Sequence, residues 1–153
     1  MTTQDDLLQP SLNTADAQHK AIYSTTAGYL TAFIGGPFAA IAMAAINSGR
    51  LRRLARDAVP LAVAILLSIG LYAIFARPEH FAQAGLEFTD RSARFGARLF
   101  ALLLFGAFWL LHKRYYRGAE LLGLEQPNPW VGGIACVVFG TLATYLVNAW
   151  LVT

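Results

Sequence analysis

Three long stretches without a charged residue constrain this chain more than any other feature of its sequence. Residues 21–49, 58–76 and 126–153 contain no Asp, Glu, Lys or Arg. A helix needs roughly 20 mostly apolar residues to cross the hydrocarbon core of a bilayer, which is about 30 Å thick. Helices on the surface of a soluble domain carry a polar stripe, and these stretches do not. The sequence therefore predicts an integral membrane protein built from helices.

A fourth apolar segment is shorter and has charges at its border. Residues 99–111 are uncharged, and extending them to a full span takes in Arg98. We expect one longer helix here, which begins after Thr89 as its N-cap and ends near Arg117. The sequence thus predicts an all-α integral membrane bundle of four transmembrane helices. The spans are expected at about 25–47, 59–76, 95–112 and 130–152.

The rest of the chain leaves room for one domain only. Residues 1–20 are polar and acidic, and are expected to form a flexible tail. Residues 21–153 then form a single membrane domain in contact with the lipid bilayer. The net charge of +3 comes from basic residues in short loops beside apolar segments, which is typical of topology determinants. We therefore expect no nucleic-acid partner.

The distribution of basic residues predicts an orientation in the membrane. The first and third loops share seven of them: Arg50, Arg52, Arg53, Arg56, Lys113, Arg114 and Arg117. The opposite side holds Lys20, Arg77, Arg91 and Arg94. Because basic loops stay in the cytoplasm, we expect loops one and three inside and both termini outside. In a bacterium this membrane would be the inner membrane.

A Gly-Gly-Pro motif lies in the middle of the first predicted helix. Pro37, after Gly35 and Gly36, removes a backbone hydrogen bond and is expected to kink the helix. Asn47, at the end of the helix, is placed to cap freed carbonyl groups. Two interpretations stay open: a structural kink, or a hinge or ligand-lined break of the kind that discontinuous transporter helices use.

Small residues recur every four positions on two of the predicted helices. On the first helix they are Gly28, Ala32, Gly36, Ala40, Ala44 and Ser48. On the fourth helix they are Gly132, Cys136, Gly140, Thr144 and Asn148. This spacing lets helix backbones approach closely inside a membrane. It predicts either packing within the bundle or an interface with a protein partner or a second copy of the chain.

Few residues in the predicted spans suggest chemistry. Arg98 is the one strongly charged residue within the expected hydrocarbon region. It is interpreted either as a contact for an anionic substrate or as a side chain that snorkels to the membrane interface. No predicted span contains an Asp or Glu, which a proton-coupled transporter usually needs.

Metal, redox and catalytic constellations are not recognisable in the sequence. His19, His80 and His112 are not at ligand spacing, and His112 reads as an ordinary polar residue at the end of a span. Cys136 is the single cysteine and behaves as a small apolar residue. We therefore expect no cofactor, no metal and no enzymatic activity.

One segment resembles a known pattern. Residues 33–40 read Phe-Ile-Gly-Gly-Pro-Phe-Ala-Ala, and Asn47 and then Arg50-Leu51 follow. This resembles small, uncharacterised bacterial multi-pass membrane proteins with F-x-G-G-P-x-A-[GA] in the first span, an Asn ten residues after the proline, and a basic stretch with Leu. Ser48 and Gly49 depart from the pattern, where an aromatic and a basic residue are expected. The resemblance implies a bacterial origin and carries no function.

These observations favour a multi-pass membrane protein without catalysis. The first hypothesis is an interaction role, as an accessory subunit or an immunity-type protein that occupies the membrane target of a toxin. The alternative is a small transporter or channel that works as an oligomer. The first hypothesis predicts a co-purifying partner, and the second predicts solute flux that depends on Pro37 and Arg98.

Overall fold

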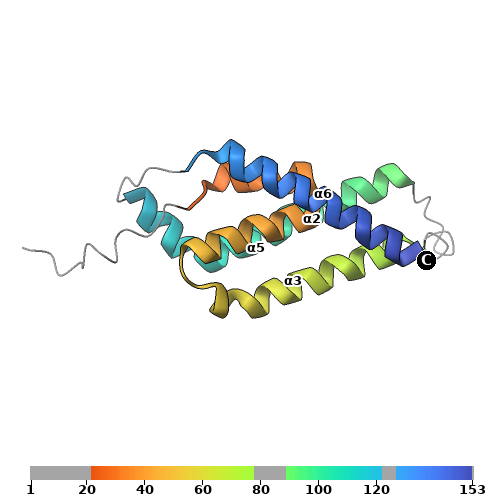
Figure 1. Cartoon of the computed structure of the whole chain (residues 1–153), viewed down its shortest axis with the longest axis horizontal. Coiled ribbons are helices and arrows are strands. Elements are labelled where there is room, and N and C mark those ends of the chain that lie inside the picture. The colour runs from red at the N-terminus through yellow and green to blue at the C-terminus, as the bar shows by residue number, and fades with distance from the viewer. Residues whose placement is uncertain (1–21, 78–88, 122–126, 153) are drawn as a thin grey trace, which may run out of the picture.

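The computed structural model describes residues 22–77, 89–121 and 127–152 (Figure 1). This part of the chain contains four helices and no strand. They are α2 (Thr25–Arg50), α3 (Leu54–Phe75), α5 (Asp90–Leu121) and α6 (Pro129–Val152). Each is long and apolar enough to cross a membrane. The predicted all-helical membrane bundle of four such helices is confirmed, and the predicted tail, residues 1–20, lies outside the described residues.

Local capping explains where two of the helices begin. The Ser24 hydroxyl accepts a hydrogen bond from the Ala27 amide at 3.1 Å, which caps α2. Thr89 caps α5 as predicted, because its hydroxyl accepts from the Ser92 amide at 3.3 Å. The Ser92 hydroxyl in turn accepts from the Thr89 amide at 2.9 Å, so the two residues cap each other as in a capping box.

The second of the four helices, α3, starts earlier than the sequence suggested. The predicted span began at residue 59, with Pro60 in the first turn, whereas α3 begins at Leu54. Arg56 and Asp57 therefore belong to a helix and not to a loop. The prediction that no span holds an acidic residue is wrong for this reason.

The helix α2 does not run straight through the bundle. Gly36 has φ 75° and ψ −166°, which is non-helical, and Pro37 follows as the first residue of a second helical arm. The Tyr23 amide donates a hydrogen bond to Asn47 Oδ1 at 3.0 Å. In a continuous helix these two residues would lie about 36 Å apart. The chain therefore reverses at Gly36, and the expectation of a bent but continuous span is wrong.

The two arms of α2 form a helical hairpin whose ends lie at one end of the bundle. This end, where Tyr23 and Asn47 meet, is the base of the hairpin. In Figure 1 the red-to-orange first arm and the orange-to-gold second arm both reach the end at which α3 begins. The arms, of 11 and 14 residues by their bounds, are about 16 and 21 Å long, shorter than the roughly 30 Å hydrocarbon core. The C-terminal end of α6 lies at the opposite end of the bundle (Figure 1). The described chain therefore enters and leaves at different ends.

The hairpin is the centre of the molecule. The first arm runs along α5, where Tyr29 meets the Phe105 ring edge-to-face with centroids 4.9 Å apart. The second arm runs along α3, where Phe38 stacks on Tyr72 at 5.9 Å. Most residues of α2 that are small or apolar are buried, whereas α3 and α6 bury only one narrow face each.

The outer surface of the bundle is apolar. Large apolar side chains are exposed along α3, α5 and α6, among them Val59, Leu66, Leu103, Val138 and Trp150. A soluble protein rarely exposes so continuous an apolar surface, and a bilayer accommodates it without cost. The described part of the chain is thus a multi-pass membrane protein with its helices packed around a central hairpin.

Candidate functional site

An open cleft of about 730 Å³ lies at the end of the bundle away from the hairpin base. All four helices contribute to it. Its lining includes the hairpin tip (Ile34, Gly35 and Gly36) and the ends of the other helices near Tyr72, Arg98 and Asn148. The tip of the hairpin therefore forms part of the wall of the cleft.

Two arginines from α5 give the cleft its positive charge. Arg94 and Arg98 both line it, one helical turn apart, and Asp90, one further turn toward the start of α5, lines it as well. The Arg98 guanidinium lies over the Phe33 ring at 5.4 Å from its centroid. Within the described residues Asp90 forms no ion pair with Arg94, although their spacing would allow one. Both guanidinium groups are exposed and can contact an anion that enters the cleft.

Neutral polar groups line the cleft beside the hairpin tip. The Tyr72 hydroxyl lies 3.3 Å from the Thr144 hydroxyl, which joins α3 to α6. The same tyrosine hydroxyl would lie 3.7 Å from a Cβ placed on Gly36. Thr141, Tyr145 and Asn148 complete this wall on α6. The cleft thus combines two cations and one carboxylate with several hydroxyl and amide groups.

The tip of the hairpin brings backbone polar groups to the cleft. The first arm ends at Gly35 and the second begins at Pro37. The last carbonyl groups of one helical arm and the first amide groups of the next lack partners within their own helices. Such paired half-helix ends bind ions and polar solutes in discontinuous transporter helices.

Close backbone packing holds the tip against α6. A Cβ on Gly35 would lie 2.9 Å from the Val137 Cα, and a Cβ on Gly140 would lie 2.6 Å from the Ala39 amide nitrogen. Both approaches need glycine, because the neighbouring atoms are backbone. The small residue at position 140 therefore serves packing within the chain.

The other predicted small residues also lie inside the bundle. Gly28 faces the Phe105 ring, and Gly132 faces the Tyr23 ring. The remaining members of the two stripes are buried or line the cleft: Ala32, Ala40, Ala44, Ser48, Cys136, Thr144 and Asn148. The period of four on α2 does not describe one continuous face, because the chain reverses at Gly36.

Asn47 holds the base of the hairpin together and does not cap carbonyls freed by Pro37. Its side-chain oxygen accepts from the Tyr23 amide, and its side-chain amide donates to the Tyr116 hydroxyl at 2.8 Å. Asn47 is buried. It therefore links both hairpin arms to α5.

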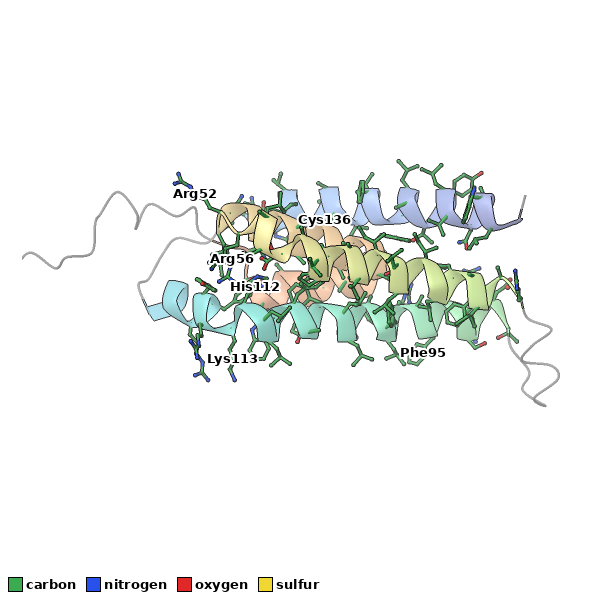
Figure 2. All side chains as sticks on the ribbon, turned by 90° about the horizontal axis from the view of Figure 1, so that it is seen from below. Arg52, Arg56, Phe95, His112, Lys113 and Cys136 are labelled. Atoms are coloured by element: carbon green, nitrogen blue, oxygen red, sulfur yellow. The ribbon has the colours of Figure 1, made fainter. Side chains whose placement is uncertain are left out.

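The predicted basic residues gather around this base. Figure 2 shows Arg52, Arg56 and Lys113 at one end of the bundle, with Phe95 toward the other. The Arg50 guanidinium lies over the Tyr23 ring at 4.5 Å and that of Arg53 over the Tyr115 ring at 4.8 Å. Arg114 and Arg117 lie exposed on the same end of α5.

A buried ionisable pair lies just inside the basic end and was missed by the sequence analysis. His112 Nε2 on α5 lies 2.8 Å from Asp57 Oδ2 on α3 (His112 is labelled in Figure 2). The two side chains are 4% and 9% exposed. The sequence predicted an interfacial position for His112 and a loop position for Asp57. The available signal was that each lies within one residue of a basic residue at a span end, Arg56 and Lys113.

Within the described residues no group of three or more His, Cys, Asp or Glu side chains could hold a metal ion. Comparison of the chain with protein-family models, with curated proteins and with solved structures finds no match. The cleft, the hairpin and the buried pair are therefore the features from which a function is inferred.

Proposed function

We propose that this protein is a small membrane transporter or channel that admits an anionic solute to the cleft. The observation that carries the proposal is the position of the hairpin tip, Ile34 to Gly36, in the wall of a cleft that Arg94 and Arg98 line. Non-helical backbone at membrane depth is tolerated where protein buries it or where it lines a water-filled cavity. Here such backbone meets polar and cationic side chains, which is the composition of a solute site.

The hairpin also suggests how the chain sits in the membrane. We propose that α3, α5 and α6 cross the bilayer and that α2 enters from the basic end and returns to it. The basic end carries the seven residues Arg50, Arg52, Arg53, Arg56, Lys113, Arg114 and Arg117, against Arg77, Arg91 and Arg94 at the described part of the other end. This asymmetry favours a cytoplasmic hairpin base and an outward-facing cleft, in a bacterial inner membrane.

The interaction hypothesis receives less support from the same contacts. The small residues that would have formed an interface, such as Gly28, Gly132 and Gly140, pack against other parts of this chain. The exposed faces instead carry large aliphatic and aromatic side chains, which suit lipid. An accessory or immunity-type role would therefore need another surface.

Uptake into vesicles tests the proposal. The purified protein, reconstituted in liposomes, is offered radiolabelled chloride, phosphate and acetate in parallel. We expect uptake of at least one anion above protein-free vesicles. Arg98→Leu should lower that uptake at least about tenfold, because a charge-assisted hydrogen bond contributes about 1.5–3 kcal/mol. Arg98→Lys should retain part of it.

A matched control lies on the same helix. Arg91 is exposed on α5 but does not line the cleft, so Arg91→Leu should leave uptake unchanged. No uptake of any of the three anions, or equal losses in the Arg91 and Arg98 variants, would contradict the proposal. Retention of phosphatidylglycerol in native mass spectrometry, lost in Arg98→Leu, would assign the cleft to a lipid headgroup and overturn solute transport. Affinity purification that recovers a stoichiometric protein partner would favour the accessory role.

A further inference from the structure

The hydrogen bonds of His112 determine how many protons the buried pair holds. His112 Nδ1 lies 2.9 Å from the Phe108 carbonyl oxygen, and Nε2 lies 2.8 Å from Asp57 Oδ2. A carbonyl oxygen only accepts, so Nδ1 must carry a proton. A second proton must lie between Nε2 and Oδ2, on one atom or the other. The pair in this geometry therefore holds two protons and has no net charge.

Loss of one proton is incompatible with both contacts at once, because the remaining proton can lie on Nδ1 or on Nε2 but not on both. Neutral His112 with its proton on Nδ1 would present the Nε2 lone pair to an ionised Asp57 oxygen at 2.8 Å. Two acceptors at that distance repel, and burial strengthens the repulsion because water cannot screen it. The pair with one proton must therefore change: with the proton on Nδ1 it separates or admits water, and with the proton on Nε2 the imidazole turns away from the Phe108 carbonyl oxygen.

Other groups near Asp57 can receive the carboxylate after separation. Ser48 from α2 and Arg53 from the α2–α3 turn are the polar and charged neighbours of Asp57 besides His112. Arg53 Nε is buried and forms no hydrogen bond within the described part of the chain, and the buried Ser48 hydroxyl lies close enough to Asp57 to interact with its carboxylate already. The helix α6 brings no charged group or histidine near Asp57, because residues 129–152 contain no Asp, Glu, Lys, Arg or His. The thiol of Cys136 packs in a different apolar cluster, with Phe105.

Within the described residues the pair is one of two side-chain hydrogen-bonded links between α3 and the neighbouring helices. Only a narrow line of α3 is buried: Asp57, Leu61, Ala64, Ser68 and Tyr72. At one end of this line Asp57 contacts α5, and at the other Tyr72 contacts Thr144 of α6. The two links are about 22 Å apart along the helix. A change at Asp57 therefore acts on one end of a helix that is otherwise held by apolar packing, such as that of Phe38 on Tyr72.

The far end of α3 lines the cleft. Tyr72, Phe75 and Ala76 belong to the cleft wall, and Tyr72 lies beside the hairpin tip at Gly36. A tilt of α3 about its middle would move these side chains relative to the arginines of α5.

We propose that Asp57 and His112 form a proton-binding site that sets the position of α3 and, through Tyr72, the shape of the cleft. The pair takes one proton from water at the basic end and closes, and it returns the proton when it opens. This proposal rests on the proposed function, for which it supplies the coupling ion. It predicts a transporter that exchanges or co-transports a proton with the anion.

Distance measurements between α3 and α5 test the site without reference to transport. Spin labels at Val59→Cys and Leu110→Cys, in a Cys136→Ala background, report the separation of the two exposed faces in nanodiscs by pulsed electron paramagnetic resonance. We expect two populations between pH 5 and pH 9, with the longer distance favoured at high pH. If one proton controls the change, the ratio of the two populations changes by at most about tenfold per pH unit.

Asp57→Asn is the decisive variant because it keeps the contact and removes the titration. The Asn side chain can donate to an unprotonated His112 Nε2 through its NH2 group or accept from a protonated Nε2 through its oxygen, so the short distance should persist throughout. Asp90→Asn, which alters a carboxylate of α5 far from the pair, should respond to pH as the parent protein does. A parent protein with a constant distance, or an Asp57→Asn variant with the parent's pH response, would overturn the proposal.

Two further outcomes separate this proposal from transport itself. Anion uptake that ignores an imposed proton gradient would refute the coupling and leave the anion site intact. A pH-dependent α3–α5 distance without uptake of chloride, phosphate or acetate would support the proton site and contradict the proposed function.

Discussion

Gly36 is the residue on which the fold depends most. Its φ of 75° and ψ of −166° lie in a region that is almost exclusive to glycine. Pro37 follows at a position where its missing N–H costs nothing, because the first amides of a helix have no intrahelical partner. The two residues together end one helical arm and begin another.

Gly36→Ala should destabilise the protein by about 1–3 kcal/mol, measured by denaturant unfolding in detergent. The cause is conformational, since the nearest atom to a Cβ here is 3.7 Å away. Gly70 on α3 is the control because a Cβ there meets nothing within 4 Å. Gly70→Ala should be neutral or stabilising by up to about 1 kcal/mol. Equal effects at the two glycines would contradict the backbone argument.

Asn47 is the second residue with a large expected effect. Asn47→Ala leaves the Tyr23 amide and the Tyr116 hydroxyl without their partner, and should lower the unfolding free energy by about 1–3 kcal/mol. Tyr116→Phe removes only one of the two bonds and should cost less. The same detergent unfolding assay compares the two variants. An Asn47→Ala variant as stable as the parent would show that the hydrogen bonds of Asn47 do not stabilise the hairpin base.

At the scale of elements, the hairpin is held by what packs on its tip. The helix α6 approaches the tip closely because Gly35 and Gly140 carry no side chain. Hydrophobicity does not drive helices together in a membrane, so contact area and close approach do. The cleft exists because α3, α5 and α6 extend beyond this tip.

Gly140→Ala should disturb the contact between α6 and the hairpin tip. The added Cβ would meet the Ala39 backbone, which cannot move away without shifting the arm, and overpacking of this kind typically costs about 1–3 kcal/mol. Gly133→Ala on the same helix should cost less, because its nearest neighbour is the rotatable hydroxyl of Thr31 at 3.1 Å. Thermal unfolding in detergent ranks the two, and the reverse order would refute the packing argument.

At the scale of the whole molecule, the hairpin changes the relation between the two ends of α2. A helix that spans the membrane places its ends on opposite sides. The hydrogen bond from the Tyr23 amide to Asn47 places the ends of α2 at the same end of the bundle. The bundle then has a basic end with the hairpin base and the buried pair, and an opposite end with the cleft.

Thiol labelling in intact cells tests this arrangement. In a Cys136→Ala background, Thr26→Cys and Arg52→Cys should react with a membrane-impermeant reagent from the same side, and Arg77→Cys from the other. All three positions are exposed in the structure. Labelling of Thr26→Cys from the side of Arg77→Cys would restore a spanning first helix and contradict the hairpin.

Much of the fold was predictable from sequence because it depends on local composition. Charge-free length fixes which segments can form helices in a bilayer, and the helices lie close to the expected spans. Gly35, Gly36 and Pro37 locate the break in α2, since glycine and proline act on their own backbone. The cap at Thr89 follows from the same local chemistry.

The tertiary structure decided what local chemistry leaves open. A break at Gly36 permits many directions, and the reversal depends on Asn47, Tyr23 and α6, which are distant in sequence. The pairing of Asp57 with His112 joins positions 55 residues apart and gives no local pattern. Arg98 was visible as a charge, but only the packing of four helices places it in a cleft with the hairpin tip. The sequence by itself determined a helical membrane protein with a broken first helix, and long-range contacts determined that the break is a reversal, because only they supply the energy that selects one direction of the chain.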